Sequence, residues 1–498
     1  MLQAMDETLP PLIQSLLEPQ RYPHAVAQVE LVQTHISWVL LAGEFAYKIK
    51  KPLRLPFLDF STLALRHACC QDELRLNRRF SPELYLGVVG IFHSAQDPRW
   101  SGEGPPIEYA VQMRRFDGAM RLDRVCARGQ LQPQHLSDLA DTLVAFHAAT
   151  AVAPQASRFG SASAIITPAR DNFHDLRQLL PQAAVHSRLA ALQAWTEAQF
   201  LQLAPRMAVR KQAGWVRECH GDLHLANLVL RDQGVRMFDC IEFNEDLRWI
   251  DVANEIAFPY VDLLAHGQPG LASWFVNEVL SRSGDYASAQ LLRFYAVYRA
   301  LVRAKVAALR MAQTHDDTAE ALAHLALAEH LVAPPPARLL ITHGLSGCGK
   351  TVASNALLHH DAQASTLRVR SDVERKRLHG LTLARHSGSA TGAGIYAADA
   401  HLRTYTRLHM LAEMLLRAGW SVIVDATFLR RADRDAFRRL AQDLGVPFAI
   451  LAPQATPVQL RERIRARRAQ GGDASEATLE VLEQQMRTVE PLGPDEFV

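Results

Sequence analysis

The chain has 498 residues, more than one hydrophobic core usually organises, so the length predicts two or three domains. Its 54 lysines and arginines against 52 aspartates and glutamates give a net charge of +2, which excludes a broad basic field for nucleic acid or an anionic membrane. The 6 cysteines form no C-x-x-C pair, which argues against structural zinc and is typical of reduced thiols. Because no signal-peptide pattern and no long apolar segment occurs, we expect a cytoplasmic protein.

Strand-like runs come first along the chain. Three apolar and β-branched runs predict an antiparallel sheet with a turn at Gly43: Val29–Val32, Ile36–Leu41 and Phe45–Ile49. The apolar spacing is helical over residues 61–80 and strand-like again over 107–116. Later apolar residues recur at steps of three and four, which predicts helices. We therefore predict a β-rich lobe over residues 1–117 and a helical lobe over 118–333.

A proline triplet, Pro334–Pro336, stiffens the chain and prevents helix formation. We therefore expect a domain boundary here, with a C-terminal domain over residues 337–498. The stretch 295–331, which precedes the boundary, is rich in alanine and leucine. It predicts one long helix that either packs back on the helical lobe or braces the next domain.

The helical lobe contains the string His220-Gly221-Asp222-Leu223-His224-Leu225-Ala226-Asn227. Asn227 follows Asp222 by five residues, and Asp239 comes after a strand-like run. Phosphoryl transfer needs a carboxylate that accepts the proton of the attacking hydroxyl, and oxygen ligands that hold Mg²⁺ against the phosphates. Asp222 suits the first role, and Asn227 and Asp239 suit the second. His220 and His224 resemble a zinc pair in spacing only, since Gly221 argues against a regular helix.

This string resembles the protein-kinase catalytic loop, with Gly221 where an arginine usually stands. The glycine variant followed by His224 is similar to that of aminoglycoside phosphotransferases and their choline-kinase-like relatives, over residues 25–310. The resemblance implies the protein-kinase fold and an ATP-dependent small-molecule kinase. It also implies that Lys48 contacts the α- and β-phosphates and that Glu73 is its ion-pair partner.

The same resemblance leaves Lys50 and Lys51 as rival assignments for the phosphate-binding lysine. It implies that Asp251 supports the catalytic loop and takes no part in the chemistry. The sequence departs from the kinase pattern at Gln33–Ser37, where no G-x-G-x-x-G occurs. Main-chain contacts to the phosphates there would have to come from Thr34 and Ser37.

A second phosphate-binding pattern follows the proline triplet. It satisfies every fixed position of G-x-x-x-x-G-K-[ST], after an apolar run and before a helical stretch, with the residues Gly344, Leu345, Ser346, Gly347, Cys348, Gly349, Lys350 and Thr351. The backbone N–H groups of such a loop surround the β-phosphate. Lys350 is expected to neutralise the β- and γ-oxygens, and Thr351 to supply a ligand to Mg²⁺.

Two later strand-like runs end in carboxylates, Asp372 and Asp425. In an open parallel sheet, ligands bind beyond the carboxyl ends of the strands, which places both residues beside the phosphates. Asp372 is the candidate that binds or deprotonates an acceptor hydroxyl. Asp425 is the candidate that orders Mg²⁺ or its water. An ordinary surface turn is the alternative for each.

A basic helix near the C-terminus is the last candidate, with arginines at positions 461, 463, 465, 467 and 468. Such a helix is often only a solvated face. After a P-loop core it resembles the lid of gluconate-kinase-like and zeta-toxin-like small P-loop kinases, and the resemblance covers residues 338–490. It implies that Arg463 and Arg467, one turn apart, close over the transferring phosphate.

Together these patterns predict an α/β and α+β protein, with an N-terminal bilobal protein-kinase-like domain and a C-terminal P-loop domain built on a mainly parallel sheet. The leading hypothesis is a kinase with two Mg-ATP sites that phosphorylates a hydroxyl of a small molecule, with no nucleic-acid or membrane partner. One alternative is a nucleotide sensor that phosphorylates no metabolite. Another is an aminoglycoside-resistance kinase whose acceptor pocket uses Glu242, Glu245 and Asp246.

Overall fold

The computed structural model describes residues 9–55, 58–314, 317–382, 398–470 and 477–496. The chain divides into two compact units, which we call the first and second units. The first comprises Met1–Leu131, Ala145–Ala164 and Ala208–Glu255, and the second comprises Gln132–Val144, Ile165–Met207 and Ile256–Val498. The three-domain division expected from the sequence stays a prediction. Among the described helices, none combines the length and apolarity that a membrane crossing requires.

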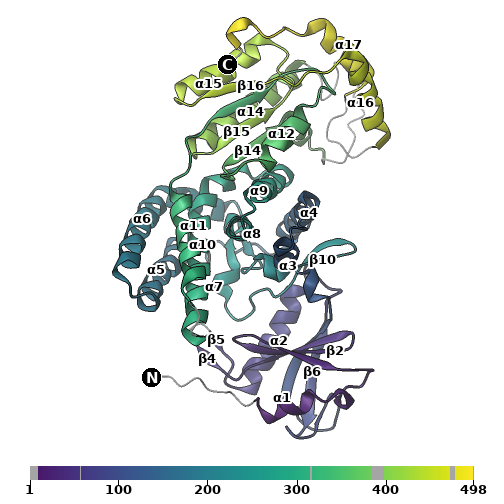
Figure 1. Cartoon of the computed structure of the whole chain (residues 1–498), viewed down its shortest axis with the longest axis vertical. Coiled ribbons are helices and arrows are strands. Elements are labelled where there is room, and N and C mark those ends of the chain that lie inside the picture. The colour runs from purple at the N-terminus through teal and green to yellow at the C-terminus, as the bar shows by residue number, and fades with distance from the viewer. Residues whose placement is uncertain (1–8, 56–57, 315–316, 383–397, 471–476, 497–498) are drawn as a thin grey trace. The chain divides into compact units, whose positions relative to one another are not determined.

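The first unit begins with an antiparallel sheet in the order β1-β2-β3-β8-β6-β7 (Figure 1). Its strands are β1 (Val29–Gln33), β2 (Ser37–Ala42), β3 (Phe45–Lys50), β6 (Tyr85–His93), β7 (Pro98–Arg99) and β8 (Glu108–Arg114). The predicted antiparallel sheet is thus confirmed. Gly43 turns the chain between β2 and β3 at φ +59°, and a Cβ there would lie 2.7 Å from the Ala25 carbonyl oxygen.

Helices and short strands complete this unit. The helix α2 (Leu63–Asn77) contacts β6 and β8, so it holds Glu73 against the sheet. A hairpin of β10 (Leu228–Arg231) and β11 (Gly234–Met237) starts just after Asn227 and ends just before Asp239. At its open end the Phe238 amide donates to the Asn227 carbonyl at 3.0 Å. The hairpin therefore brings two sequence-distant metal-ligand candidates to one place.

The remaining elements of this unit are short, and several helices run across the boundary between the units. The short ones are α1 (Pro11–Leu16), β4 (Arg54–Leu55), β5 (Leu58–Asp59), α3 (Leu122–Ala127), β9 (Val216–Glu218), α7 (Glu245–Arg248) and β12 (Trp249–Asp251). The boundary-crossing helices are α4 (Pro133–Ala149), α5 (Ala162–Leu179), α6 (Ala183–Gln212) and α8 (Val252–Ala265).

The second unit shows that one long helix over 295–331 was a wrong prediction. The structure has two helices there, α10 (Ala289–Thr314) and α11 (Ala319–Val332), which contact each other extensively. Asp317 accepts a hydrogen bond from the Ala319 amide at 3.0 Å, and Arg310 pairs with Glu320 across the two helices at 3.2 Å. Alanine and leucine favour helix on both sides of the break, so periodicity alone does not reveal it.

The P-loop part of the second unit is a parallel sheet in the order β14-β15-β13-β16, which confirms the predicted mainly parallel sheet. Its strands are β13 (Leu339–Thr342), β14 (Thr366–Arg370), β15 (Ser421–Asp425) and β16 (Phe448–Leu451). The helices are α12 (Lys350–His359), α13 (Ser371–Leu378), α14 (Ala398–Arg417), α15 (Arg431–Asp443), α16 (Pro457–Gln470) and α17 (Leu479–Thr488).

The edge strand β14 is covered by α9 (Pro269–Ser283). The Asn277 amide accepts from the Arg368 N–H at 2.6 Å and donates to the Thr366 carbonyl at 2.9 Å. A side chain therefore satisfies backbone groups that an exposed edge would leave unpaired. At the start of the same helix, a Cβ on Gly270 would lie only 2.0 Å from the His359 carbonyl oxygen at the end of α12.

We expect Gly270→Ala to force α9 and α12 apart and to cost about 1 to 3 kcal/mol, the usual range for overpacking. Thermal melting followed by tryptophan fluorescence measures the loss, because Trp274 lies on α9 and stacks on His359 at 4.5 Å. Gly118→Ala is the control, since a Cβ at that position meets nothing within 4 Å. Equal melting of both variants would contradict the close approach.

Candidate functional site

The catalytic-loop candidate lies between β9 and β10 of the first unit, and a buried carboxylate holds its backbone. Glu255 accepts from the His220 amide at 2.6 Å and from the Gly221 amide at 2.9 Å. Gly221 has φ +87°, and a Cβ there would lie 2.7 Å from the Leu247 carbonyl oxygen. Glycine is therefore required at this position. Sequence reasoning missed Glu255, because a lone glutamate in an apolar helix gives no signal of its backbone partners.

Asp222 is held by two neighbours from its own loop. The Asn227 side-chain amide donates to the Asp222 carbonyl oxygen at 2.9 Å and to its carboxylate at 3.3 Å. His224 Nε2 lies 3.3 Å from the same carboxylate. The His220 ring bonds the Phe238 carbonyl at 2.8 Å, and burial lowers the pKa of His220, which favours its neutral form. The loop is thus tied to the segment that leads into Asp239.

Of the three lysines in question, Lys48 contacts both expected partners. Its Nζ lies 2.8 Å from Glu73 Oε1 and 2.5 Å from Asp239 Oδ1. Lys50, fully buried, instead pairs with the second Glu73 oxygen and with Glu242. The Lys51 ammonium lies over the Trp38 ring at 5.5 Å. The geometry therefore favours Lys48 over its two rivals, and one carboxylate orders two lysines.

The charges around Lys48 fix its protonation state and that of Asp239. Burial disfavours the Lys48 ammonium, but Asp239 and Glu73 outweigh it and raise the pKa of Lys48 well above its ordinary value. Burial would raise the pKa of Asp239, yet Lys48 lowers it below its ordinary value. Asp239 is therefore ionised at neutral pH, as a ligand to a hard cation must be.

The donor set here fits Mg²⁺. The side-chain nitrogen of Asn227 donates to Asp222, so the side-chain oxygen Oδ1 is the atom of Asn227 that suits a metal. Asp239 adds a carboxylate that is 43% exposed, at φ +64° directly after the hairpin. Oxygen ligands of this kind are those that Mg²⁺ prefers. The supporting candidate Asp251 instead pairs with Arg210 at 2.7 Å and caps the Ala253 amide, away from any metal role.

One other group in the described part of the chain has the atoms of a metal site: His147, Cys219 and Glu255, all buried. Glu255 already accepts the two loop amides, however, and burial raises the pKa of the Cys219 thiol well above its ordinary value. A thiol that stays protonated is a poor metal ligand. This cluster therefore supports the loop.

The acidic residues that suggested a pocket for polycations are each paired with a basic residue. Glu242 binds Lys50, Glu245 lies 3.2 Å from Arg248, and Asp246 lies 2.9 Å from Arg158. Their charges are neutralised within the first unit. The carboxylate cluster therefore offers no excess negative charge for an aminoglycoside.

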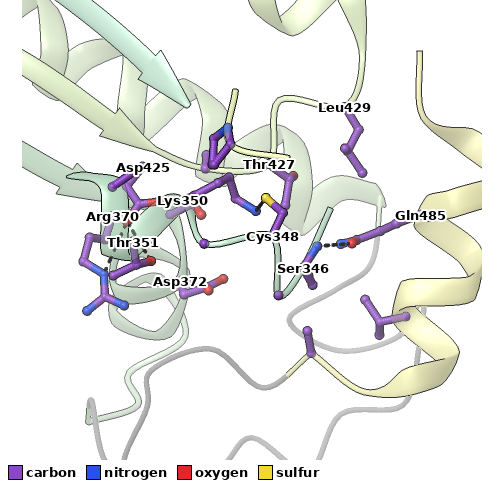
Figure 2. A pocket seen from close by; sticks show the side chains of 18 of the residues that line it. Ser346, Cys348, Lys350, Thr351, Arg370, Asp372, Asp425, Thr427, Leu429 and Gln485 are labelled. Carbon is purple, nitrogen blue, oxygen red and sulfur yellow. Dashed lines mark hydrogen bonds and ion pairs between the residues drawn. The ribbon is translucent and has the colours of Figure 1, made fainter. Parts of the chain in front are cut away.

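The second candidate site is a cavity of about 930 Å³ at the carboxyl ends of the parallel strands (Figure 2). The P-loop turns from β13 into α12 through three glycines at positive φ, namely Gly344, Gly347 and Gly349. Lys350 Nζ donates to the Gly344 and Leu345 carbonyls, at 2.8 Å each. This lysine thus lies folded over its own loop, within reach of the space that the loop surrounds.

Asp425 and Thr351 meet at the end of β15. The Thr351 hydroxyl donates to Asp425 Oδ2 at 3.0 Å, and the Ser354 hydroxyl lies 3.3 Å from the same oxygen. A hydroxyl beside a buried carboxylate is an oxygen pair that fits Mg²⁺. Asp372 lies at the start of α13, lines the same cavity, and pairs with Arg375 at 2.9 Å. The P-loop residues 346–351 thus line one cavity together with Asp372 and Asp425, whereas Gly344 and Leu345 are not among its lining residues.

The structure describes the side chain of only one of the two lid candidates, Arg463 and Arg467. Arg463 donates to the Gly347 carbonyl at 3.2 Å and lines the cavity. The side chain of Arg467 lies outside the described residues. His401 and Asp433, which sequence reasoning missed, also line the cavity and pair at 3.1 Å. They come from α14 and α15, far apart along the chain, so no local motif marks them.

Gln485 on α17 is a further missed residue. Its Oε1 accepts from the Ser346 amide at 2.9 Å, as Figure 2 shows, and this is a P-loop amide of the kind that binds phosphate oxygen. We expect Gln485→Ala to tighten binding of Mg-ATP by about fivefold, since one competing hydrogen bond is worth about 1 kcal/mol. Calorimetry on a Lys48→Ala background, in which the first site is weakened, measures the change.

Gln484→Ala is the matched control for that measurement. Gln484 lines the same cavity, and among the described residues its side chain makes no bond to the P-loop. We expect Gln484→Ala to bind Mg-ATP with the same affinity as the parent Lys48→Ala protein. Equal affinities of all three proteins would show that Gln485 does not compete with phosphate.

Residues 113–275 match the model of the phosphotransferase enzyme family, and residues 339–492 match an AAA domain. The uncharacterized protein Rv2004c of Mycobacterium tuberculosis is 30% identical over 455 residues, which are 91% of this chain and 88% of that protein. The chain belongs to the same family. The resemblance predicted from the two motifs is thus confirmed, and the chain is a kinase-type phosphotransferase joined to a P-loop domain.

Two solved structures match this chain at lower sequence identity. A choline/ethanolamine kinase family protein from Mesorhizobium loti is 14% identical, with a TM-score of 0.42, and the match covers 67% of this chain and 96% of that one. A sugar kinase from Janibacter is 22% identical, with a TM-score of 0.25, over 32% of this chain and 83% of that one.

Proposed function

We propose that this protein is an ATP-dependent kinase that phosphorylates a hydroxyl group of a small molecule at the first site, and that the P-loop holds a second Mg-ATP. The observation that carries the proposal is the convergence at Lys48. Its ammonium contacts Glu73 and Asp239, while Asn227, across the hairpin from Asp239, contacts the Asp222 carboxylate. These five groups come from separate segments of the chain, and their meeting supports a phosphoryl-transfer site here.

Each side chain has a physical task in this scheme. Asp222 accepts a hydrogen bond from the acceptor hydroxyl and then takes its proton. Lys48, kept cationic by its neighbours, binds phosphate oxygens, and Glu73 fixes its position. Asn227 and Asp239 would hold Mg²⁺, which neutralises charge that develops on the phosphates. Such a site works by positioning and electrostatics.

The P-loop site is proposed as a second nucleotide site on similar grounds. Lys350 and the loop amides suit phosphate oxygens, and Thr351 with Asp425 suits Mg²⁺. Asp372 and Arg463 line the cavity, and in this scheme Asp372 would accept the proton of a hydroxyl and Arg463 would bind the transferring phosphate. The second candidate function, a nucleotide sensor, applies to this site. Gln485 favours it, because phosphate must displace the glutamine from the Ser346 amide, so nucleotide binding would move α17.

Labelled ATP with a panel of hydroxyl compounds and a metabolite extract tests the proposal. We expect a phosphorylated small molecule whose formation depends on the protein and on Mg²⁺. ATP binding at both sites without any product would favour the sensor. Cells that express the protein should keep their ordinary aminoglycoside tolerance, since Glu242, Glu245 and Asp246 are neutralised by basic partners.

A further inference from the structure

Four polar side chains of the first unit recur at a spacing of four residues, and none is more than 1% exposed. We call them the buried row: Glu73, Asn77, Ser81 and Tyr85. The helix α2 ends at Asn77, and β6 begins at Tyr85. The spacing is kept past the helix end, because the Ser81 amide donates to the Asn77 carbonyl at 2.9 Å and the Tyr85 amide to the Ser81 carbonyl at 3.4 Å. Residues four apart in such turns share a face.

Tyr85 holds the backbone of the metal-ligand candidate Asp239. Its hydroxyl accepts a hydrogen bond from the Asp239 amide at 2.9 Å. Asp239 has φ +64°, a conformation that residues other than glycine adopt uncommonly and that persists where the surrounding structure holds it. A rotation of this backbone would redirect the carboxylate. The Tyr85 hydroxyl therefore helps to fix the direction in which Asp239 presents its oxygens.

Ser81 and Asn77 hold the chain on either side of Asp239. Ser81 Oγ donates to the Met237 carbonyl oxygen at 2.7 Å, and Asn77 Oδ1 accepts from the Cys240 amide at 3.0 Å. Both bonds are buried, where a hydrogen bond is stronger than in water and costly to lose. The buried row thus binds the backbone before, at and after the metal-ligand candidate.

The first member of the buried row acts on the phosphate-binding candidate. Glu73 Oε1 lies 2.8 Å from Lys48 Nζ, and Asn77 Nδ2 donates to the Glu73 carbonyl oxygen at 2.8 Å. One continuous segment therefore positions both the ammonium and the carboxylate that phosphoryl transfer directs at the same phosphates. Groups of this kind are productive only when they are held within about 0.5 Å of the required geometry.

We propose that Tyr85, with Ser81 and Asn77, is a positioning residue that sets the affinity of the first site for its metal ion through Asp239. The inference rests on the proposed function, which supplies the Mg²⁺ that Asp239 would hold. Loss of a group that orients a metal ligand typically lowers metal affinity by about 10- to 100-fold. Tyr85→Phe removes only the hydroxyl, so it should raise the Mg²⁺ concentration for half-maximal ATP binding by at least about tenfold.

Calorimetric titration of ATP at a series of free Mg²⁺ concentrations measures this requirement. The full chain is used in a Lys350→Ala background, in which the P-loop is weakened. Tyr22→Phe is the matched control, because Tyr22 is also a buried tyrosine of the first unit and its hydroxyl donates to the Leu16 carbonyl on α1 at 2.8 Å. The control loses a buried hydrogen bond of the same kind, so its melting temperature should fall while its Mg²⁺ requirement equals that of the parent.

A double-mutant cycle shows whether Tyr85 acts through Asp239. Asp239→Asn should itself raise the Mg²⁺ requirement, and Tyr85→Phe should add little in that background. Equal requirements in Tyr85→Phe, Tyr22→Phe and the parent would overturn the assignment, as would an undiminished shift in the Asp239→Asn background. Should Tyr85→Phe fail to fold, Ser81→Ala tests the same buried row: a higher requirement than that of Tyr22→Phe supports the assignment, and an equal one overturns it.

The two proposals fail in different ways. If Tyr85→Phe shifts the Mg²⁺ requirement but no acceptor is phosphorylated, the proposed function is wrong and the positioning role stands. If an acceptor is phosphorylated and Tyr85→Phe needs no more Mg²⁺ than Tyr22→Phe, the function stands and the positioning role is wrong. Absence of Mg²⁺-dependent ATP binding in the Lys350→Ala parent would overturn both.

Discussion

Asp222→Asn is expected to reduce phosphotransfer by at least about 10³-fold while ATP binding persists. The change keeps the size of the side chain but removes the carboxylate that takes the hydroxyl proton, and loss of a general base together with substrate positioning has an effect of this order. The loop should keep its shape, because Glu255 holds the backbone amides at His220 and Gly221. Single-turnover product formation, with calorimetry of Mg-ATP binding, separates the chemistry from affinity.

Lys350→Ala is the comparison that assigns the chemistry to one site. If the first site transfers the phosphoryl group, this variant should keep product formation and lose the P-loop nucleotide. Full loss of product in Lys350→Ala, with retention in Asp222→Asn, would move the chemistry to the P-loop and to Asp372. Partial loss in Lys350→Ala would show that nucleotide at the P-loop influences the first site.

Glu73→Leu is expected to destabilise the first unit by about 3 to 5 kcal/mol, the range seen when one partner of a buried ion pair is removed. Glu73 is fully buried and pairs with Lys48 and Lys50 through its two oxygens. Its loss leaves Lys50 with Glu242 and Lys48 with the more exposed Asp239. Thermal and urea melting of the full chain measure the effect, as an early transition of the first unit.

Two further variants show whether the lysines cause that loss. Glu73→Leu combined with Lys50→Met should recover part of the stability, because it removes one of the two buried charges. Glu83→Gln is the exposed control, since Glu83 pairs with Arg236 on the surface and should change stability by less than about 0.5 kcal/mol. An equal effect of Glu83→Gln and Glu73→Leu would contradict the account.

The local sequence was sufficient to predict a feature wherever a few neighbouring residues determine it. The P-loop glycines need positive φ, and glycine is the residue that adopts it without strain, so their spacing defines the loop. The strand-like runs around Gly43 formed the predicted antiparallel sheet, since apolar and β-branched residues favour strands on both sides of a tight turn. Family membership also followed from the motifs, because they are long enough to be specific.

Partners distant in sequence were not predictable. Glu255, Gln485 and the pair of His401 with Asp433 lie in ordinary helical segments, and only packing brings them to a loop or a cavity. The choice among Lys48, Lys50 and Lys51 likewise required the position of Asp239 relative to β3, since Glu73 pairs with both Lys48 and Lys50. In a strand, residues two apart share a face, so Lys48 and Lys50 are equivalent to periodicity alone.

By itself, the sequence determined which chemical groups this protein carries: a kinase-like loop, a P-loop and their oxygen ligands. Tertiary structure decided which lysine meets Asp239, which acids are neutralised, and which distant carboxylate holds the catalytic loop. The physical reason is the distance along the chain over which each property is determined. Backbone conformation is set by neighbours a few residues away, whereas the electrostatic state of a side chain depends on charges and burial supplied by segments more than a hundred residues distant.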